Sequence, residues 1–288
     1  MSAPLDPIDA DLSSKRVIVT GATAGIGREA AWGLAKLGAE LVLVGRNAAK
    51  LEATRDELVA RGAARDKLAT AMAELSSVSD VHRLADELCE RFDRVDALLN
   101  NAGCYPDARR ITAEGFEEAW ATNVLAYEVL TTRLVDRLAE ARGRIVLVAS
   151  TKAGQLDMDD LDFSRRRFGG VAAYEQSKQA NRMLAWAWQR RLAGRDVTIN
   201  VAHPGGVATN IANRQKGLWG AIVRLAFKTQ RTPEMGADTL VWLVASPELE
   251  GESGGFYKDR RAIPCKWRGE VAAQETLWQR CQEQIARR

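Results

Sequence analysis

Tyr174 and Lys178 are the two residues of this chain whose types and spacing most directly suggest chemistry. They are four residues apart in a segment that predicts a helix, so their side chains share one face. A free tyrosine has a pKa of about 10 and is a poor base at neutral pH, but a neighbouring ammonium favours its phenolate. Such a pair can give a proton to a carbonyl oxygen or take one from an alcohol. An isolated YxxxK spacing also occurs in solvated helix pairs, so other motifs must support this interpretation.

A glycine-rich turn near the N-terminus predicts a phosphate-binding site. Residues 20–27 read TGATAGIG and follow a short β-branched run, Arg16–Thr20. Glycines let the backbone turn tightly and approach a pyrophosphate, and the helix that begins here supplies amide donors and a favourable dipole. The alternative is a tight strand-to-helix turn without a ligand. The later motifs favour dinucleotide binding.

Alternating strands and helices must position these motifs. Short apolar runs predict strands at residues 16–20, 40–45, 67–73, 95–99, 144–150 and 197–202. Helices are expected up to about residue 37 with Gly38 as C-cap, from Asn47 as N-cap to Arg61, over 77–92, over 113–141 with a break near Asn123, and over 171–192. This alternation predicts an α/β Rossmann fold, a single domain with a doubly wound parallel sheet flanked by helices.

Several further motifs occur in one order along the chain. NNAG stands at Asn100–Gly103, an isolated Asn123 lies in ATNVLA, and HPGGVAT spans His203–Thr209. Together with the TGxxxGxG turn and YxxxK, they make the chain resemble the short-chain dehydrogenase/reductase superfamily over roughly residues 15–260. The resemblance implies a nicotinamide-dependent oxidoreductase.

The resemblance also implies which residues carry the reaction and hold the cofactor. Lys178 is expected to bind the nicotinamide ribose, while Thr209 and the backbone of Val207 are expected to meet the carboxamide. The implied catalytic set is Asn123, Ser150, Tyr174 and Lys178. The expected cofactor contacts are Gly21, Thr23, Gly25, Ile26, Gly27, Arg46, Glu74, Leu75, Asn101, Ala102, Gly103, Asn123, Tyr174, Lys178, Pro204, Gly205, Val207 and Thr209.

The catalytic hydroxyl has two candidates at the end of the strand expected over 144–150. Relatives end this strand with two serines, of which the second is catalytic; counting from the strand selects Ser150, whereas counting back from Ala153 and Gly154 selects Thr151. We prefer Ser150, because a strand fixes position more firmly than a loop; its role is to hold and polarise the substrate oxygen. Asn123 resembles an asparagine that orders a water beside the lysine, or else it is a buried polar residue at a helix kink.

Arg46 bears on the choice of dinucleotide. An NAD enzyme usually carries an acid at the end of its second strand, which accepts both ribose hydroxyls; this chain has Gly45 and Arg46 there. A guanidinium can pair with a 2′-phosphate that a carboxylate would repel, so NADP(H) is the expected cofactor. Arg28 is expected either to face the phosphates or to lie solvated on its helix. Glu74, where relatives usually carry Asp, either accepts from the adenine amino group or is a surface acid.

The substrate side of the expected site lies in two segments. The insert 156–168 (LDMDDLDFSRRRF) resembles one in members similar to retinol dehydrogenases and the WW domain-containing oxidoreductase, which act on lipophilic aldehydes, ketones and alcohols. Residues 211–231 lie where the family keeps its substrate lid, and the apolar run 218–227 is expected to be that lid, then core, then a membrane-surface segment, in this order. We divide the chain into an N-terminal extension 1–14, a catalytic domain 15–260 and a C-terminal helical extension 261–288.

The composition argues against several other classes of protein. A net charge of +3 with scattered basic residues argues against binding of nucleic acid. Four cysteines without a CxxC pair, and only two histidines, argue against a metal site. A polar, acidic start and the lack of an 18-residue apolar stretch argue against a signal peptide and an integral membrane segment, so we expect a reduced, cytoplasmic protein.

The leading prediction is an NADP(H)-dependent oxidoreductase that reduces a carbonyl of a lipophilic small molecule, or runs the reverse reaction, with Tyr174 as general acid/base. One alternative is a non-catalytic dinucleotide-binding regulator or scaffold, and another is epimerisation or dehydration on the same scaffold. Relatives commonly form homodimers or homotetramers through the two long helices around the fifth strand. Those helices carry Trp120, Leu130, Trp186 and Trp188, which are expected to be either core or interface.

Overall fold

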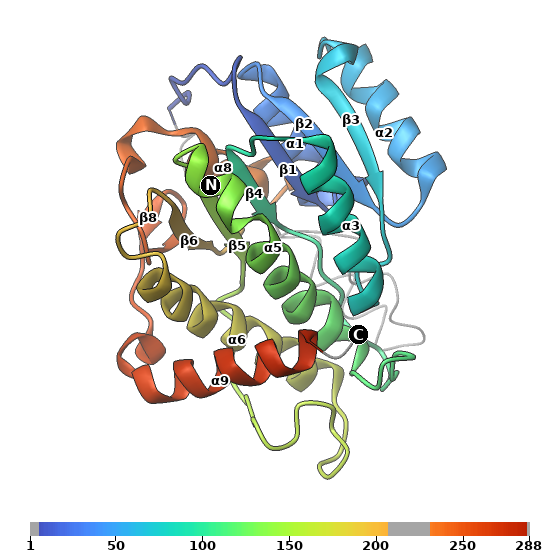
Figure 1. The fold of residues 1–288 in the computed structure, drawn as a ribbon, viewed down its shortest axis with the longest axis vertical. Helices are drawn as coiled ribbons and strands as arrows, with labels where there is room; N and C mark the ends of the chain where they lie inside the picture. The colour runs from blue at the N-terminus through green and yellow to red at the C-terminus, as the bar shows by residue number, and fades with distance from the viewer. Residues whose placement is uncertain (1–5, 207–230, 287–288) are drawn as a thin grey trace.

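One sheet organises the molecule, and Figure 1 shows helices on both of its faces. The computed structural model describes residues 6–206 and 231–286. These residues form an eight-stranded sheet in the order β3-β2-β1-β4-β5-β6-β7-β8, parallel except for the β7–β8 pair. The chain winds outward from β1 to β3, crosses back to β4 beside β1, and winds outward again. This is the predicted doubly wound α/β fold in a single domain.

The elements follow the predicted alternation closely. The strands are β1 (Arg16–Thr20), β2 (Glu40–Gly45), β3 (Leu68–Met72), β4 (Ala97–Asn100), β5 (Arg144–Val148), β6 (Thr198–Ala202), β7 (Phe256–Lys258) and β8 (Arg261–Ala262). The α-helices of the described residues are α1 (Gly25–Lys36), α2 (Ala48–Ala60), α3 (Val78–Arg91), α4 (Glu118–Trp120), α5 (Ala126–Glu140), α6 (Gly170–Arg191), α8 (Pro233–Ala245) and α9 (Val271–Ile285). Asn47 caps α2 as predicted, since its side chain accepts from the Lys50 amide at 2.9 Å.

The two faces of the sheet bury two apolar clusters, because successive side chains of a strand point to opposite faces. On β1, Ile18 faces the layer of α3, α5 and α6. Its neighbours Val17 and Val19 face the layer of α1, α2 and α8. Strands covered on both sides read as continuous apolar runs, which is why the sequence pattern located them well.

The helix predicted over 113–141 begins later and contains an irregular turn. Ile111 pairs with Glu117 in an isolated bridge, and Gly115 turns the chain with φ +86°. Helix therefore starts with α4, passes through a π-helical turn at Ala121–Leu125, and continues as α5. The π turn contains Asn123, where the sequence predicted a break, and such turns often occur at functional sites.

Helix α9 lies across α5 and α6 in Figure 1. The Trp188 ring meets the Trp278 ring of α9 edge to face at 6.1 Å, and Trp120 Nε1 donates to Gln284 Oε1 at 2.9 Å. The aromatic and apolar residues predicted to be core or interface, Trp120, Leu130, Trp186 and Trp188, are all buried within the chain. They are therefore core residues. Within residues 6–206 and 231–286, no helix is long and apolar enough to cross a membrane.

Glu128 is a buried carboxyl between α5, α6 and α9. Trp188 Nε1 donates to its two oxygens at 3.1 and 3.0 Å, and Gln282 Nε2 donates at 3.3 Å. Burial raises the pKa of Glu128 to about 7, against the opposing effects of the Trp188 hydrogen bond and the Arg191 charge. The folded protein therefore holds this proton more tightly than the unfolded chain does.

We expect this group to weaken the fold as the pH rises. Its contribution is complete below the unfolded pKa of about 4.3 and is lost as pH rises to the folded value, a decrease of about 4 kcal/mol in the free energy of unfolding. Glu128→Gln should remove this slope in urea unfolding between pH 5 and 8. Glu140→Gln, at the exposed end of the same helix, should retain it. An unchanged slope in Glu128→Gln would show that another group titrates.

Candidate active site

A groove of about 720 Å³ runs along the carboxyl ends of the central strands. In doubly wound sheets this edge, where the strand order reverses, is the usual ligand site. Its volume is within the range of small-molecule and cofactor sites. The residues that line it are Gly21, Thr23, Ala24, Gly25, Ile26, Gly27, Gly45, Arg46, Asn47, Lys50, Ala73, Glu74, Leu75, Asn101, Ala102, Gly103, Cys104, Tyr105, Glu118, Thr122, Val148, Ala149, Tyr174, Lys178 and Pro204.

The glycine turn forms one wall of this groove. Gly21 and Gly25 have φ +68° and +53°, which a residue with a side chain adopts at a cost. A Cβ on Gly27 would lie 2.3 Å from both Asn101 Nδ2 and Gly21 O, so the first turn of α1 touches the turn before it. The N-terminus of α1 thus opens on the groove without side chains in the way, which fits a pyrophosphate.

Thr20 joins the glycine turn to the NNAG segment. Its Oγ1 accepts from the amides of Asn101 at 2.9 Å and Ala102 at 3.0 Å. Asn101 Nδ2 returns a hydrogen bond to Thr20 O at 2.9 Å. The two motifs are 80 residues apart in sequence, and these bonds hold them as adjacent walls of one groove.

The ends of β2 and β3 place charged side chains around the far end of the groove. Arg46 is exposed and pairs with Glu74 at 3.6 Å, and both line the groove; their contact with a cofactor stays a prediction. Lys50, in the first turn of α2, also lines the groove and escaped the sequence analysis. Arg28 pairs with Glu29 at 3.3 Å and Glu57 at 3.1 Å and does not line the groove. The solvated alternative for Arg28 therefore fits the structure better than contact with phosphate.

Tyr174 and Lys178 lie together at the other end of the groove, on the second and third turns of α6. Lys178 Nζ is 5.7 Å from the centre of the Tyr174 ring and donates to Val148 O at 2.9 Å. Burial lowers the pKa of Lys178 to about 8. Burial also raises the pKa of Tyr174, and a hydrogen bond with the Ser150 side chain partly opposes that rise. A buried cation therefore lies beside a phenol that keeps its proton at neutral pH.

Asn123 fastens the π turn to the segment after NNAG. Its Oδ1 accepts from the Cys104 amide at 2.8 Å, and its Nδ2 donates to Cys104 O at 3.0 Å and Ser177 Oγ at 3.0 Å. A Cβ on Gly103 would lie 3.3 Å from Asn123 Oδ1 and 3.7 Å from Lys178 Nζ. The asparagine and the lysine thus border one small space that a side chain at position 103 would fill.

The structure separates the two candidates for the catalytic hydroxyl. Ser150 is buried and hydrogen-bonds the Tyr174 side chain. Thr151 is exposed, and its Oγ1 lies 3.1 Å from His203 Nε2. Burial and the nearby Lys258 lower the pKa of His203 to about 4, so this histidine is neutral and faces Thr151. The strand count thus selected the hydroxyl that contacts Tyr174, although β5 itself ends two residues earlier, at Val148.

Some expected contacts fall outside the described residues. Val207, Thr209 and most of the expected lid are among them. Pro204 lines the groove, and Gly205 has φ +84° with Arg231 packed against it. Among residues 6–206 and 231–286, no group of three or more His, Cys, Asp or Glu side chains is arranged to hold a metal ion.

Three side chains near this site escaped the sequence analysis. Tyr127 donates to Ala102 O at 2.8 Å, and Ser177 Oγ donates to Tyr174 O at 2.7 Å. Tyr105 lines the groove with its ring centre 5.1 Å from that of Tyr174. Tyr127 is four residues after Asn123, which places it on the same helix face, but nothing in the sequence marked the other two.

The sequence matches the family model described as short chain dehydrogenase over residues 15–217. The chain belongs to this family. It is therefore an oxidoreductase of the carbonyl–alcohol type, as the resemblance implied. The match includes the glycine turn, Asn123, Ser150, Tyr174 and Lys178, whose proximity is described above.

Two curated relatives cover most of the chain. A protein of Streptomyces sp. (strain C5), DnrU, provisionally named a daunorubicin C-13 ketoreductase, is 40% identical over 88% of this chain and 86% of its own. Human retinol dehydrogenase 13 is 34% identical over 87% of this chain and 78% of its own.

Solved structures share the fold. An uncharacterized protein from Mycobacterium paratuberculosis is similar with a TM-score of 0.76 and 26% identity, over 96% of both chains. A short chain dehydrogenase from Burkholderia cenocepacia J2315 in complex with NADP has a TM-score of 0.67 and 26% identity, over 85% of this chain and 96% of its own.

The close contact at Gly27 yields a prediction about the groove. Gly27→Ala should lower the free energy of unfolding by about 1–3 kcal/mol, because the new methyl collides with Gly21 O and Asn101. It should also weaken NADPH binding, measured by fluorescence titration. Gly269→Ala, where a Cβ meets nothing within 4 Å, is the control and should change neither quantity. Equal effects of the two variants would contradict the proposed packing.

Proposed function

We propose that this protein is an NADP(H)-dependent carbonyl reductase, or alcohol dehydrogenase in reverse, for lipophilic small molecules. One observation carries the proposal. Tyr174 and Lys178 line one end of a groove whose other walls are a glycine turn and the basic residues after β2, and the buried Ser150 contacts Tyr174 there without being among the lining residues. Proton transfer and dinucleotide binding therefore share one continuous site.

The residues of the chain divide the work of reduction between them. A bound nicotinamide dinucleotide supplies the hydride. Ser150 and Tyr174, joined by a hydrogen bond, hold the carbonyl oxygen, and Tyr174 donates the proton that this oxygen needs as it becomes an alcohol. The raised pKa of Tyr174 favours this direction, because the phenol is protonated before the reaction. Lys178 stabilises the phenolate left behind, and Asn123 borders the space through which the proton is replaced.

Two cations support NADP(H) over NAD(H). Arg46 and Lys50 both line the end of the groove beyond the glycine turn, and no acid follows β2 directly. The Arg46–Glu74 pair is exposed and 3.6 Å long, so it is weak and leaves the guanidinium able to turn toward a phosphate. The Burkholderia cenocepacia relative was solved with NADP.

A lipophilic substrate fits the names of two relatives, retinol dehydrogenase and daunorubicin ketoreductase. The groove near Tyr174 is lined by Cys104, Tyr105 and Thr122, and Glu118 and Lys178 are the ionisable acid and base that line it beside them. A carbonyl carried on an apolar body would meet few ionic groups there. We therefore propose ketones and aldehydes with large apolar portions as substrates.

Tyr174→Phe should lower kcat for ketone reduction by about 10²–10⁴-fold, because the phenylalanine ring has no proton to donate. NADPH binding should be retained. The measurement is NADPH oxidation over a panel of lipophilic and polar ketones and aldehydes, with binding followed by fluorescence. If wild-type protein binds NADPH and reduces none of the panel, the regulator hypothesis replaces this proposal.

The two hydroxyls after β5 provide a matched comparison. Ser150→Ala should lower kcat by about 10²-fold, since it removes a group that holds the substrate oxygen. Thr151→Ala should have little effect, because that hydroxyl faces His203. A larger loss in Thr151→Ala would reverse the assignment.

Arg46→Ala should reduce kcat/KM with NADPH by about 30-fold, the expected loss for a charge-assisted contact, and leave kcat/KM with NADH unchanged. Arg28→Ala is the control, because Arg28 is paired away from the groove. Equal losses with both dinucleotides, or none with either, would show that Arg46 does not select the 2′-phosphate.

A further inference from the structure

Tyr105 is a second aromatic side chain at the reacting end of the groove. Its ring is tilted by 36° to that of Tyr174, with the two centres 5.1 Å apart, a geometry typical of attractive aromatic pairs. It is half-buried, and burial together with Glu175 raises its pKa, so it stays neutral. Tyr105 is therefore a flat, uncharged wall beside the phenol that donates the proton.

The backbone that carries Tyr105 is fastened on both sides. Asn123 holds the amide and the carbonyl of Cys104, at 2.8 and 3.0 Å. On the other side, Pro106 O packs so closely on Gly170, the first residue of α6, that a Cβ there would lie 2.0 Å away. Tyr105 is thus fixed between the π turn and the helix that bears Tyr174.

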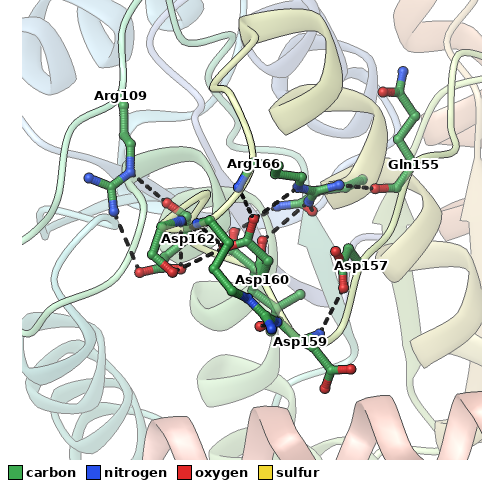
Figure 2. A network of polar contacts seen from close by, with 11 residues as sticks. Arg109, Gln155, Asp157, Asp159, Asp160, Asp162 and Arg166 are labelled. Atoms are coloured by element: carbon green, nitrogen blue, oxygen red, sulfur yellow. Dashed lines mark hydrogen bonds and ion pairs between the residues drawn. The ribbon is translucent and has the colours of Figure 1, made fainter.

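The insert between β5 and α6 braces the same segment. Arg109 Nε donates to Asp162 O at 2.7 Å, and its guanidinium lies 3.5 Å from the Asp162 carboxylate (Figure 2). Arg109 is four residues after Tyr105, so the insert contacts the same loop segment that carries the Tyr105 ring.

Asp160 gives the insert its shape, as Figure 2 shows. Its buried carboxylate accepts from the amides of Ser164 at 2.7 Å, Arg165 at 3.0 Å and Arg166 at 2.9 Å. Burial alone would raise the pKa of Asp160, but these hydrogen bonds lower it to about 2, so the carboxylate is charged at every physiological pH.

Arg166 and Gln176 attach the folded insert to α6. The Arg166 guanidinium donates to Gln176 Oε1 and lies 4.1 Å from the centre of the Phe163 ring, while Gln176 Nε2 donates to Leu161 O at 2.8 Å. Phe163 has φ +56°, which a bulky residue adopts only when its surroundings hold it. The insert is therefore a rigid body docked on the catalytic helix.

We propose that Tyr105 is a specificity-determining residue that selects flat, unsaturated carbonyl substrates, and that Asp160 is the positioning residue that keeps the wall in place through the insert. This inference rests on the proposed reductase function and deepens it. Because the Tyr105 ring is held in place, a planar ring or polyene can stack on it and bind more tightly. A puckered, saturated substrate makes less contact with the ring.

The first test compares aryl methyl ketones with cyclohexyl methyl ketone in NADPH-dependent reduction. Tyr105→Leu should lower the ratio of kcat/KM values, aryl over cyclohexyl, by about tenfold, mainly through KM for the aryl ketone. Tyr105→Phe keeps the ring and should keep the ratio. An unchanged ratio in Tyr105→Leu overturns the assignment of Tyr105.

The second test addresses the insert. Asp160→Asn should lower the same ratio and open the chain to trypsin at Arg165–Arg167, because the amides there lose their anionic acceptor. Asp159→Asn is the matched control: its exposed carboxylate pairs with the exposed Arg280 at 2.8 Å, a weak surface contact, so the variant should alter neither result. A folded Asp160→Asn with an unchanged ratio overturns the positioning role. If Asp160→Asn does not fold, the ratio in Arg109→Ala, which cuts the link to Asp162, decides the question in the same way.

The two proposals fail in different ways. If wild-type protein binds NADPH but reduces neither ketone, the reductase function and the specificity of Tyr105 fall together, whereas trypsin cleavage of Asp160→Asn and not of Asp159→Asn would still support the insert as a rigid brace. If wild-type protein reduces both ketones and Tyr105→Leu leaves the aryl-over-cyclohexyl ratio of kcat/KM unchanged, only the further inference is wrong.

Discussion

The hydrogen bond from Lys178 Nζ to the carbonyl oxygen of Val148 is the contact on which the site depends. It ties the buried end of a catalytic side chain to the last residue of β5, and so aligns α6 with the carboxyl edge of the sheet. Tyr174 is one turn earlier on the same helix and Ser150 is two residues beyond the end of β5, so this bond helps to bring all three near each other. Removing an ammonium from water is costly, and a carbonyl acceptor offsets part of that cost.

Buried ionisable groups occur in distinct settings, with different consequences. Asp160 is surrounded by amides, which lower its pKa to about 2 and make the insert independent of pH. Glu128 is buried between helices, and this burial raises its pKa to about 7 although two neutral donors oppose the rise, so the contact with α9 is sensitive to pH. Lys178, with a pKa of about 8, is mostly protonated at neutral pH and loses its proton as the pH rises by about one unit beyond that. Burial is the largest cause of the shifts at Glu128 and Lys178, whereas at Asp160 the hydrogen bonds from backbone amides outweigh it.

The glycine turn and the insert orient backbone amides in opposite ways at the two ends of the groove. At Gly21 and Gly27 the backbone comes so close to other backbone that no side chain fits, which leaves amides facing the groove. At the insert a carboxylate gathers amides inward and leaves a rigid outer surface against the Tyr105 segment. One arrangement exposes donors to a ligand, and the other uses them to build a wall.

Much of this could be read from the chain alone, because strands covered on both faces and a tight phosphate turn leave strong local patterns. The α/β fold, the places of the six predicted strands, and the motifs holding Gly21, Asn123, Tyr174 and Lys178 all followed from such patterns. The late start of α4, the π turn around Asn123, the Arg46–Glu74 pair and the Tyr105 wall did not. Each of these depends on which distant segments meet, and spacing along a sequence carries no information about a contact between residues that are tens of positions apart. Ser150 lies between the two cases: its position after the strand singled it out, but only its burial beside Tyr174 distinguished it from Thr151.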